Sequence, residues 1–275
     1  MTSLRTPFYQ ALIRVLPFKQ DAAARAAGKL FGGKVKAVVN QASMLLDLGE
    51  TIQRLMFLGV YEPIQTEWFK QCLGPGDAIV DIGASFGYYT SLAAQLVGPT
   101  GQVFAFEPSP VANSTIEGAI KATGLRNVKL TKAAVGKQSG VVSLYLPNTG
   151  HLHSPSILKN DPAFKPLDVP VIVLDQFEPL SHVPGIKLVK IDVEGYEPDV
   201  LEGMAGLIKK GKIENVICEF NSGWLRRNAT TSEQLLARFL DLGFLVYKKT
   251  ELQGNLTGHL DEQYELQDVW FTMQR

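Results

Sequence analysis

The sequence predicts an α/β protein with a parallel sheet flanked by helices. From Asp77 onward, apolar strand-like segments alternate with segments of helical spacing. One predicted strand, Ala78–Ile82, runs into a glycine turn that opens a helix, and the next, Gln102–Phe106, is followed directly by the acid Glu107. Ligands of open α/β sheets bind beyond the carboxyl ends of the strands. The turn and the acid therefore predict a nucleoside site at that edge of the sheet.

Residues 1–72 are predicted to form a helical cap, and residues 73–275 the main domain. Helical spacing or composition favours four helices in the cap, at Pro7–Leu16, Asp21–Leu30, Glu50–Leu58 and Ile64–Cys72. Such a cap either packs on the domain or closes over a ligand. In the second case Tyr61 and Glu62, just before the main domain, are the residues expected to contact the substrate.

The main domain is predicted to contain seven strands of the principal sheet and four helices. The strands are Ala78–Ile82, Gln102–Phe106, Val128–Lys132, Lys187–Asp192, Asn215–Phe220, Phe244–Lys249 and Asp268–Met273. The helices are Tyr88–Val97, Pro110–Thr123, Pro198–Lys209 and Thr231–Leu242.

An additional pair of strands, Val141–Leu146 and Val169–Leu174, interrupts this alternation. The segment 147–168 between them carries four prolines together with His151 and His153. A loop of this length inside a compact domain is usually functional or disordered. We predict that it forms a substrate lid.

Composition limits the possible partners and the compartment. Lysine plus arginine equals aspartate plus glutamate, at 27 each, so net charge favours neither nucleic acid nor an anionic membrane. Cys72 and Cys218 lie far apart in apolar surroundings, as expected of buried thiols in a reducing compartment. Charged residues interrupt the apolar residues of the N-terminal segment, and no run is long enough for a signal peptide or a membrane span. We therefore expect a cytoplasmic protein.

The glycine turn is suited to a nucleoside without phosphates. Gly83 and Gly87 remove Cβ where the backbone turns and a ligand approaches it. Glu107 can accept hydrogen bonds from both hydroxyls of a ribose. The Gly-x-Gly-x-x-Gly pattern that cradles a pyrophosphate is missing, which disfavours NAD. S-adenosylmethionine is such a nucleoside, and Asp81 could hold its amino-acid end; the alternatives are a helix cap for Asp81 and an ordinary turn for the glycines.

Three blocks of the sequence resemble the FkbM family of S-adenosylmethionine-dependent methyltransferases. They are Val80–Thr90, the run Ala105-Phe106-Glu107-Pro108-Ser109-Pro110, and Leu188–Glu197, and the resemblance extends over about residues 44–222. It implies a Rossmann-like class I methyltransferase fold, with a mostly parallel seven-stranded sheet and a reversed last pair of strands. It also implies that Ala84, Ser85 and Pro108 join the cofactor site. Family members often carry asparagine where this chain has Ser85.

Candidate catalytic residues follow the later strands. Asp192 leaves the strand end nearest the expected methyl group, so it is the first candidate for the base and also a cofactor contact, with Glu194 beside it in the substrate site. His151 and His153 are the other candidate bases, because imidazole titrates near neutral pH. Ala133 and Ala134 offer small surfaces against which an adenine could lie, although small residues after a strand equally serve packing.

A magnesium site is an alternative use of three of the polar residues. Asp192, Glu219 and Asn221 offer two carboxylates and an amide oxygen, which suit Mg²⁺. Otherwise no metal is expected, and Glu219 and Asn221 line the acceptor pocket.

The family resemblance favours methylation of a hydroxyl on a small metabolite or sugar. Methylation of an amine, on a small molecule or a protein side chain, is a second possibility. A non-catalytic module that binds the cofactor is a third, and an NAD-dependent oxidoreductase is disfavoured by the missing pyrophosphate loop. The sequence indicates neither the acceptor nor the oligomeric state.

Overall fold

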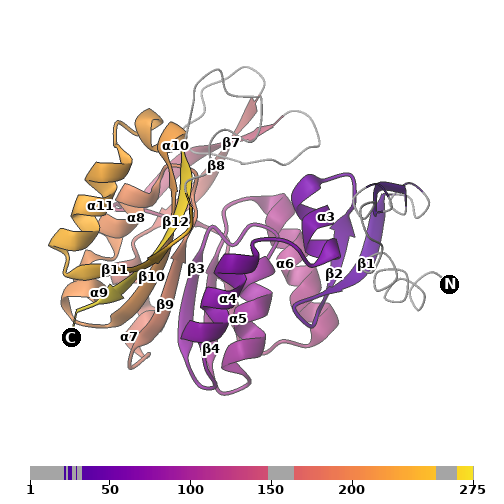
Figure 1. The fold of residues 1–275 in the computed structure, drawn as a ribbon, viewed down its shortest axis with the longest axis horizontal. Helices are drawn as coiled ribbons and strands as arrows, with labels where there is room; N and C mark the ends of the chain where they lie inside the picture. Colours follow the sequence, from indigo (N-terminus) through magenta and orange to yellow (C-terminus); the bar gives the residue numbers. More distant parts are fainter. Residues whose placement is uncertain are drawn as a thin grey trace.

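A seven-stranded sheet forms the centre of the computed structural model (Figure 1). The structure describes residues 33–147, 164–251 and 265–274, together with positions 22, 24–26 and 29. In spatial order the strands are β11 (Phe244–Lys249), β12 (Leu266–Met273), β10 (Ile213–Asn221), β9 (Ile186–Ile191), β3 (Ala78–Ile82), β4 (Gln102–Phe106) and β5 (Val128–Thr131).

The directions of these strands confirm the expected Rossmann-like sheet. Strands β10, β9, β3, β4 and β5 pair in parallel, whereas β12 pairs antiparallel with both β10 and β11. Because β12 lies between β10 and β11, the last two strands occur in the reverse of their chain order. The parallel strands place their carboxyl ends at one edge, where the site is expected.

Helices cover both faces of the sheet (Figure 1). One face packs against α4 (Pro63–Cys72), α5 (Tyr88–Val97) and α6 (Pro110–Thr123). The other packs against α7 (Glu178–Ser181), α8 (Glu197–Gly203), α9 (Ala205–Lys209), α10 (Ser222–Arg227) and α11 (Ser232–Asp241). Two buried apolar clusters, one on each side, hold these layers together. Capping of α11 is complete, because Thr231 and Gln234 form a reciprocal capping box.

The predicted helix Pro198–Lys209 is in fact two helices, α8 and α9. Asp175, in the 3₁₀ turn η1 (Leu174–Gln176), accepts hydrogen bonds of 2.7 Å from the amides of both Gly206 and Leu207. A carboxylate that satisfies these amides starts a new helix N-terminus there. The sequence gives no local sign of this distant cap.

The predicted helical cap, residues 1–72, also contains a β-hairpin, in the stretch between the predicted helices Asp21–Leu30 and Glu50–Leu58. Strands β1 (Lys34–Val39) and β2 (Ala42–Asp47) form an antiparallel hairpin, joined by Asn40 and Gln41 at positive φ. The side chains of β1 alternate strictly between exposed and buried, which is the period of a strand. Helices α3 (Thr51–Leu58) and α4 then follow as predicted. Pro7–Leu16 lies outside the described residues, whereas the described positions 22, 24–26 and 29 are helical.

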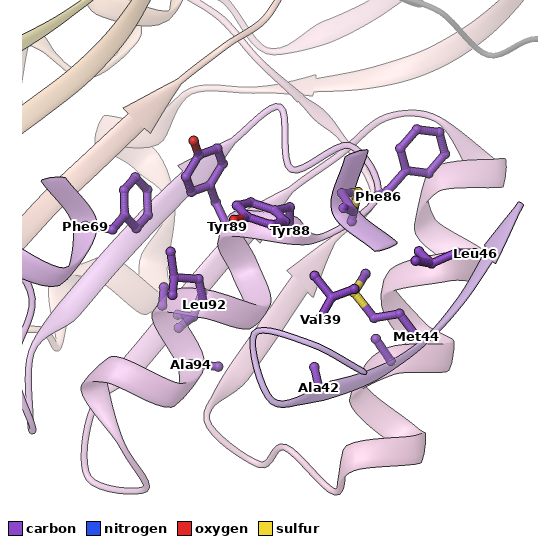
Figure 2. Close-up of a cluster of buried hydrophobic side chains, with 14 of the residues drawn as sticks. Val39, Ala42, Met44, Leu46, Phe69, Phe86, Tyr88, Tyr89, Leu92 and Ala94 are labelled. Carbon is purple, nitrogen blue, oxygen red and sulfur yellow. The ribbon is translucent and has the colours of Figure 1, made fainter. Parts of the chain in front are cut away.

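The hairpin packs against the start of α5. Figure 2 shows Met44 and Leu46 of β2 in the same apolar cluster as Phe86 and Tyr88. The Asn40 side-chain amide also donates a 3.1 Å hydrogen bond to the carbonyl of Tyr88. The hairpin therefore supports the turn in which the predicted nucleoside site begins.

A second sheet, in the order β6-β8-β7, contains the interrupting strands. It comprises β6 (Ala134–Val135), β7 (Gly140–Pro147) and β8 (Phe164–Ile172). Residues 164–168, predicted as part of the lid loop, belong to β8, because apolar side chains continue the alternation of that strand through Leu167. Residues 148–163, with His151 and His153, lie outside the described residues. Across the described ranges, no helix is both long and apolar enough to cross a bilayer.

Candidate functional site

The glycine turn after β3 presses directly against the chain after β9. The amides of Gly83 and Ala84 donate to the carbonyl of Phe106 at 3.0 and 3.1 Å. Gly83 has φ +81°, and a Cβ at this position would lie 1.8 Å from the backbone oxygen of Asp192. Glycine is therefore required both by the backbone conformation and by the close approach. Three predicted site segments, after β3, β4 and β9, meet here.

Glu107 is buried and holds two loops together. Its Oε2 accepts a 2.8 Å hydrogen bond from the amide of Ser85, and its Oε1 accepts one of 2.7 Å from the amide of Ser109. Burial raises the pKa of Glu107 to about 7, although the two amides act in the opposite direction. Near neutral pH the carboxyl thus exchanges between a neutral form and an anion that accepts hydrogen bonds.

Ser85 adopts a conformation that suits asparagine better than serine. Its φ is +49°, in the left-handed region, and its side chain is exposed. Asparagine tolerates this region because its short amide forms local hydrogen bonds. We expect Ser85→Asn to raise the free energy of unfolding, by at most about 1 kcal/mol. Chemical denaturation measures the change, with Ser85→Gly as the control for relief of strain alone; a fall in stability for Ser85→Asn would contradict this explanation.

Asp81 lies on β3 with one oxygen satisfied and one free. Its Oδ2 accepts a 2.6 Å hydrogen bond from the hydroxyl of Thr90, in the first turn of α5, so part of the predicted helix-cap role is present. Its Oδ1 is buried and, among the described residues, has no hydrogen-bond partner. Burial raises the pKa of Asp81, and the positive charge of Lys190 opposes the shift. A buried carboxylate oxygen without a donor is suited to a ligand amine.

A row of polar side chains crosses the sheet beneath α4 and α5. On each of four adjacent strands, an apolar residue two positions away from the polar one packs in the cluster on this face: two positions earlier on the three parallel strands and two positions later, at Trp270, on the antiparallel β12. Alternation along a strand then places the polar residue on the same face. Asp81 pairs in register with Lys190, and Glu219 with Asp268. The row consists of Asp81, Lys190, Glu219 and Asp268, on β3, β9, β10 and β12.

Lys190 connects this row to Asp192. Its Nζ donates a 2.8 Å hydrogen bond to Asp192 Oδ2 and lies 4.8 Å from the ring centre of Tyr89. The Lys190 side chain is 4% exposed and that of Asp192 26%. Burial lowers the pKa of Lys190, but the negative charges of Asp192, Glu62 and Asp81 outweigh burial and leave the pKa above its usual value. Lys190 is therefore a permanent cation, and Asp192 is the partner that reaches solvent.

The N-terminus of α4 covers the row from above. Glu62, the N-cap residue, has φ +40° and accepts a hydrogen bond from the hydroxyl of Tyr89. Gln65 donates a 2.5 Å hydrogen bond to Asp268 Oδ2. Tyr61 packs edge-on against Tyr88, with ring centres 4.9 Å apart. Tyr61 and Glu62, predicted substrate contacts, thus lie close to the strand ends that carry the predicted base.

Glu219 and Asp268 form a cross-strand pair of carboxyls. Burial is the largest cause of the raised pKa of both groups. The negative charges of Asp192 and Glu194 raise the pKa of Glu219 further. The negative charge of Glu62 contributes to the raised pKa of Asp268, which is about 7. Two like charges opposite each other on one face cannot both ionise cheaply. This part of the site is therefore suited to donors of hydrogen bonds and unsuited to anions.

The loop after β9 is shaped by Glu197. Its Oε1 accepts hydrogen bonds from the amides of Val193 and Gly195, at 3.2 and 3.1 Å, and burial raises the pKa of Glu197 to about 8. Within this loop Glu194 has φ +53°. Glu197 is thus a structural residue that orients Glu194 and Asp192.

The remaining predicted residues have local structural roles in this arrangement. Asn221 caps α10, because its Oδ1 accepts from the amides of Gly223 and Trp224 at 3.2 and 3.3 Å. Its oxygen is thus already used, which weakens the predicted magnesium site. Ala133, just before β6, and Ala134, within β6, are both buried, and Ala84 is buried in the turn, whereas Pro108 is half-buried. Over the described ranges, no group of three or more His, Cys, Asp or Glu side chains could hold a metal ion.

Three residues of this site escaped prediction: Thr90, Gln65 and Asp268. Thr90 and Asp81 both belong to the Val80–Thr90 block that resembles the FkbM family, so the sequence contained a signal that could have indicated their contact. Gln65 and Asp268 are 203 positions apart and meet only because β12 inserts beside β10.

Comparison with known proteins gives partial matches to methyltransferases. The protein named Methyltransferase 1 from Beauveria bassiana is 30% identical over 149 residues, which cover 47% of this chain and 59% of that protein. A protein-L-isoaspartate O-methyltransferase from Methanococcus aeolicus is 36% identical over 58 residues, or 21% of this chain and 27% of that protein. The chain therefore spans less than two thirds of these relatives.

Among solved structures, precorrin-6y C5,15-methyltransferase from Geobacter metallireducens is 14% identical, with a TM-score of 0.44 over 76% of this chain and 87% of that chain.

The family described as the methyltransferase FkbM domain matches residues 81–246, which is more than half of the chain. The match begins in β3 and ends in β11, a strand at one edge of the sheet. The glycine turn, Glu107 and the loop after β9 all fall within that match. The chain thus belongs to the FkbM family of S-adenosyl-L-methionine-dependent methyltransferases.

Proposed function

We propose that the protein methylates a hydroxyl group of a small molecule, with Asp192 as the general base. One observation carries the proposal: the backbone of Asp192 touches the Gly83 turn while its carboxylate is held by Lys190. A base in this position can reach a hydroxyl presented next to the cofactor site. Proximity and removal of one proton are the main contributions a protein makes to methyl transfer.

The cofactor residues follow from the same geometry. S-adenosyl-L-methionine supplies an electrophilic methyl group. Glu107, between the Ser85 and Ser109 amides, is proposed to accept the ribose hydroxyls, and Asp81 to accept the amine through its free Oδ1. Gly83, Ala84 and Gly87 provide the backbone surface against which the nucleoside lies, and Pro108, Ala133 and Ala134 border the proposed adenine position.

The choice of base follows from the charges. Lys190 holds its proton because the surrounding carboxylates raise its pKa, so it cannot accept one from a hydroxyl. Asp192 is a hydrogen-bond acceptor and is partly exposed toward the site. Tyr61, Glu62, Glu194 and Glu219 are proposed to bind the acceptor around it. His151 and His153 stay alternative bases, outside the described residues.

The surplus of carboxyl groups favours a hydroxyl over an amine as the acceptor. An amine placed near Glu62, Glu219 and Asp268 is stabilised in its protonated form, which has no lone pair for attack. A hydroxyl instead donates hydrogen bonds to these groups and loses its proton only in the transition state. Acceptor screening distinguishes this proposal from its two alternatives. Methyl transfer to amines alone would indicate an amine methyltransferase, and cofactor binding without transfer to any acceptor would indicate a non-catalytic role.

The first test is the affinity for S-adenosylhomocysteine, measured by calorimetric titration. We expect Glu107→Ala to weaken binding by about 1.5–3 kcal/mol, the range for hydrogen bonds to charged groups. Glu117→Ala is the matched control, because Glu117 lies exposed on α6 in a 2.7 Å ion pair with Lys132. Equal affinities for the two variants would refute the ribose role. Absence of wild-type binding would refute the cofactor site itself.

The raised pKa of Glu107 adds a pH signature to this titration. Ribose hydroxyls donate stronger hydrogen bonds to the ionised carboxylate than to the neutral acid, so affinity should rise as pH increases through about 7 and then level off. Glu107→Gln should remove this dependence. In the absence of ligand, the same carboxyl contributes less stability as pH rises from 4.5 to about 7, because the folded state binds its proton more tightly.

A further inference from the structure

Lys190 is a buried cation that lies between the two halves of the proposed site. Its strand places it in register with Asp81, the proposed cofactor residue, and its ammonium bonds Asp192, the proposed base. At 4% exposure, water does not compete for this ammonium. The face of Tyr89 closes another side of it at 4.8 Å. The ammonium is therefore fixed in place, unlike that of an ordinary surface lysine.

We propose that Lys190 is a positioning residue for the base: its ammonium, fixed by Tyr89, aims the Asp192 carboxylate and keeps it ionised. The inference rests on the proposed function, because it takes Asp192 as the base. It assigns Lys190 no contact with the acceptor.

A comparison along the same strand separates this role from ordinary pairing. Lys187, three residues earlier on β9, forms an ion pair of the same 2.8 Å length with Glu214. Both partners of that pair are about one third exposed, at 32% and 39%. Solvent weakens such pairs, whereas a buried charge pair acts strongly on the protonation of its partner. Lys187 is therefore a matched control on the same element.

Several ionisable groups besides Lys190 interact electrostatically with Asp192. The carboxyl groups among them add negative charge when they are ionised, and the ammonium of Lys190 offsets that charge. The groups are Asp81 from β3, Glu107 after β4, Tyr61 before α4, Glu197 at the start of α8, Cys218 and Glu219 from β10, and Asp268 from β12. Glu62 acts on Lys190 and Glu194 acts on Glu219. Burial raises the pKa of Tyr61 and Cys218, so these two side chains are uncharged. Removal of the cation should consequently favour protonation of Asp192.

The experiment titrates Asp192 directly and needs no acceptor. In full-length protein labelled with carboxyl-¹³C aspartate, the Asp192 signal is assigned as the one missing in Asp192→Asn. We expect Lys190→Met to raise the pKa of Asp192 by about one to three units. Lys187→Met should leave it unchanged. An unchanged Asp192 pKa in Lys190→Met would overturn the inference.

Two further measurements keep the inference testable if Lys190→Met folds poorly or the proposed function fails. The double variant Asp81→Asn with Lys190→Met removes one charge of each sign. Its Asp192 pKa is compared with the Asp192 pKa of Asp81→Asn alone. A higher pKa in the double variant supports the inference, and an equal pKa overturns it. Once an acceptor is known, the acid limb of the kcat profile should move with the NMR pKa. If the acid limb stays in place while the NMR pKa rises, Asp192 is not the base, and the proposed function fails. The same result would still demonstrate that Lys190 controls the pKa of Asp192.

Discussion

Asp192→Asn should lower the turnover of methyl transfer by about 10²–10⁴-fold, the usual contribution of a positioned general base. Asparagine keeps the size of the side chain and its hydrogen bond to Lys190, but cannot accept a proton. The backbone oxygen that meets Gly83 is also unchanged. Affinity for S-adenosylhomocysteine should therefore stay close to that of the wild type.

The measurement is single-turnover transfer from S-adenosylmethionine to an acceptor found by screening hydroxylated compounds. Asp241→Asn serves as the matched control, because Asp241 is exposed at the end of α11. Full activity of Asp192→Asn would exclude Asp192 as the base and direct attention to His151 and His153. A joint loss of cofactor affinity would instead indicate that Asp192 acts mainly on the cofactor.

Local patterns in the sequence predicted the elements around the Gly83 turn well. The strands Ala78–Ile82 and Gln102–Phe106 and the helix Tyr88–Val97 have the predicted bounds, because glycine, proline and apolar runs mark their ends. The Gly83 turn and Glu107 lie at the expected edge. These features depend on residues close together in the chain, and such features can be predicted from sequence.

The arrangement of residues on the proposed acceptor side depends on long-range strand pairing, and only part of this pairing could be predicted. Glu219 and Asp268 are cross-strand partners because β12 inserts between β10 and β11, an order that only the family resemblance indicated. The burial of Lys190 likewise depends on α4 and α5 covering the sheet, so neither this burial nor the choice of Asp192 as its carboxylate partner could be predicted from the sequence. The β1–β2 hairpin was missed although its two-residue period was present, since residues 1–72 as a whole were assigned to a helical cap.

Gly83→Ala should have the largest effect on stability of any single substitution considered for this protein. The added Cβ lies 1.8 Å from the Asp192 oxygen and 2.9 Å from its carbonyl carbon, so the turn or the loop after β9 must move. Alanine also has to adopt φ +81°, which costs about 1–3 kcal/mol. Strain and overlap together should lower the free energy of unfolding by about 4 kcal/mol or more.

Gly124→Ala separates these two causes. Gly124 has φ +71° at the end of α6, and a Cβ there meets nothing within 4 Å, so this variant bears the conformational cost alone. Chemical denaturation should show a much smaller loss for Gly124→Ala, with normal affinity for S-adenosylhomocysteine. Gly83→Ala, if it folds, should lose both affinity and turnover, because the proposed cofactor turn and the loop that carries the proposed base share one contact. Equal losses for the two variants would mean that the turn and the loop can separate freely, and that the position of Asp192 does not depend on Gly83.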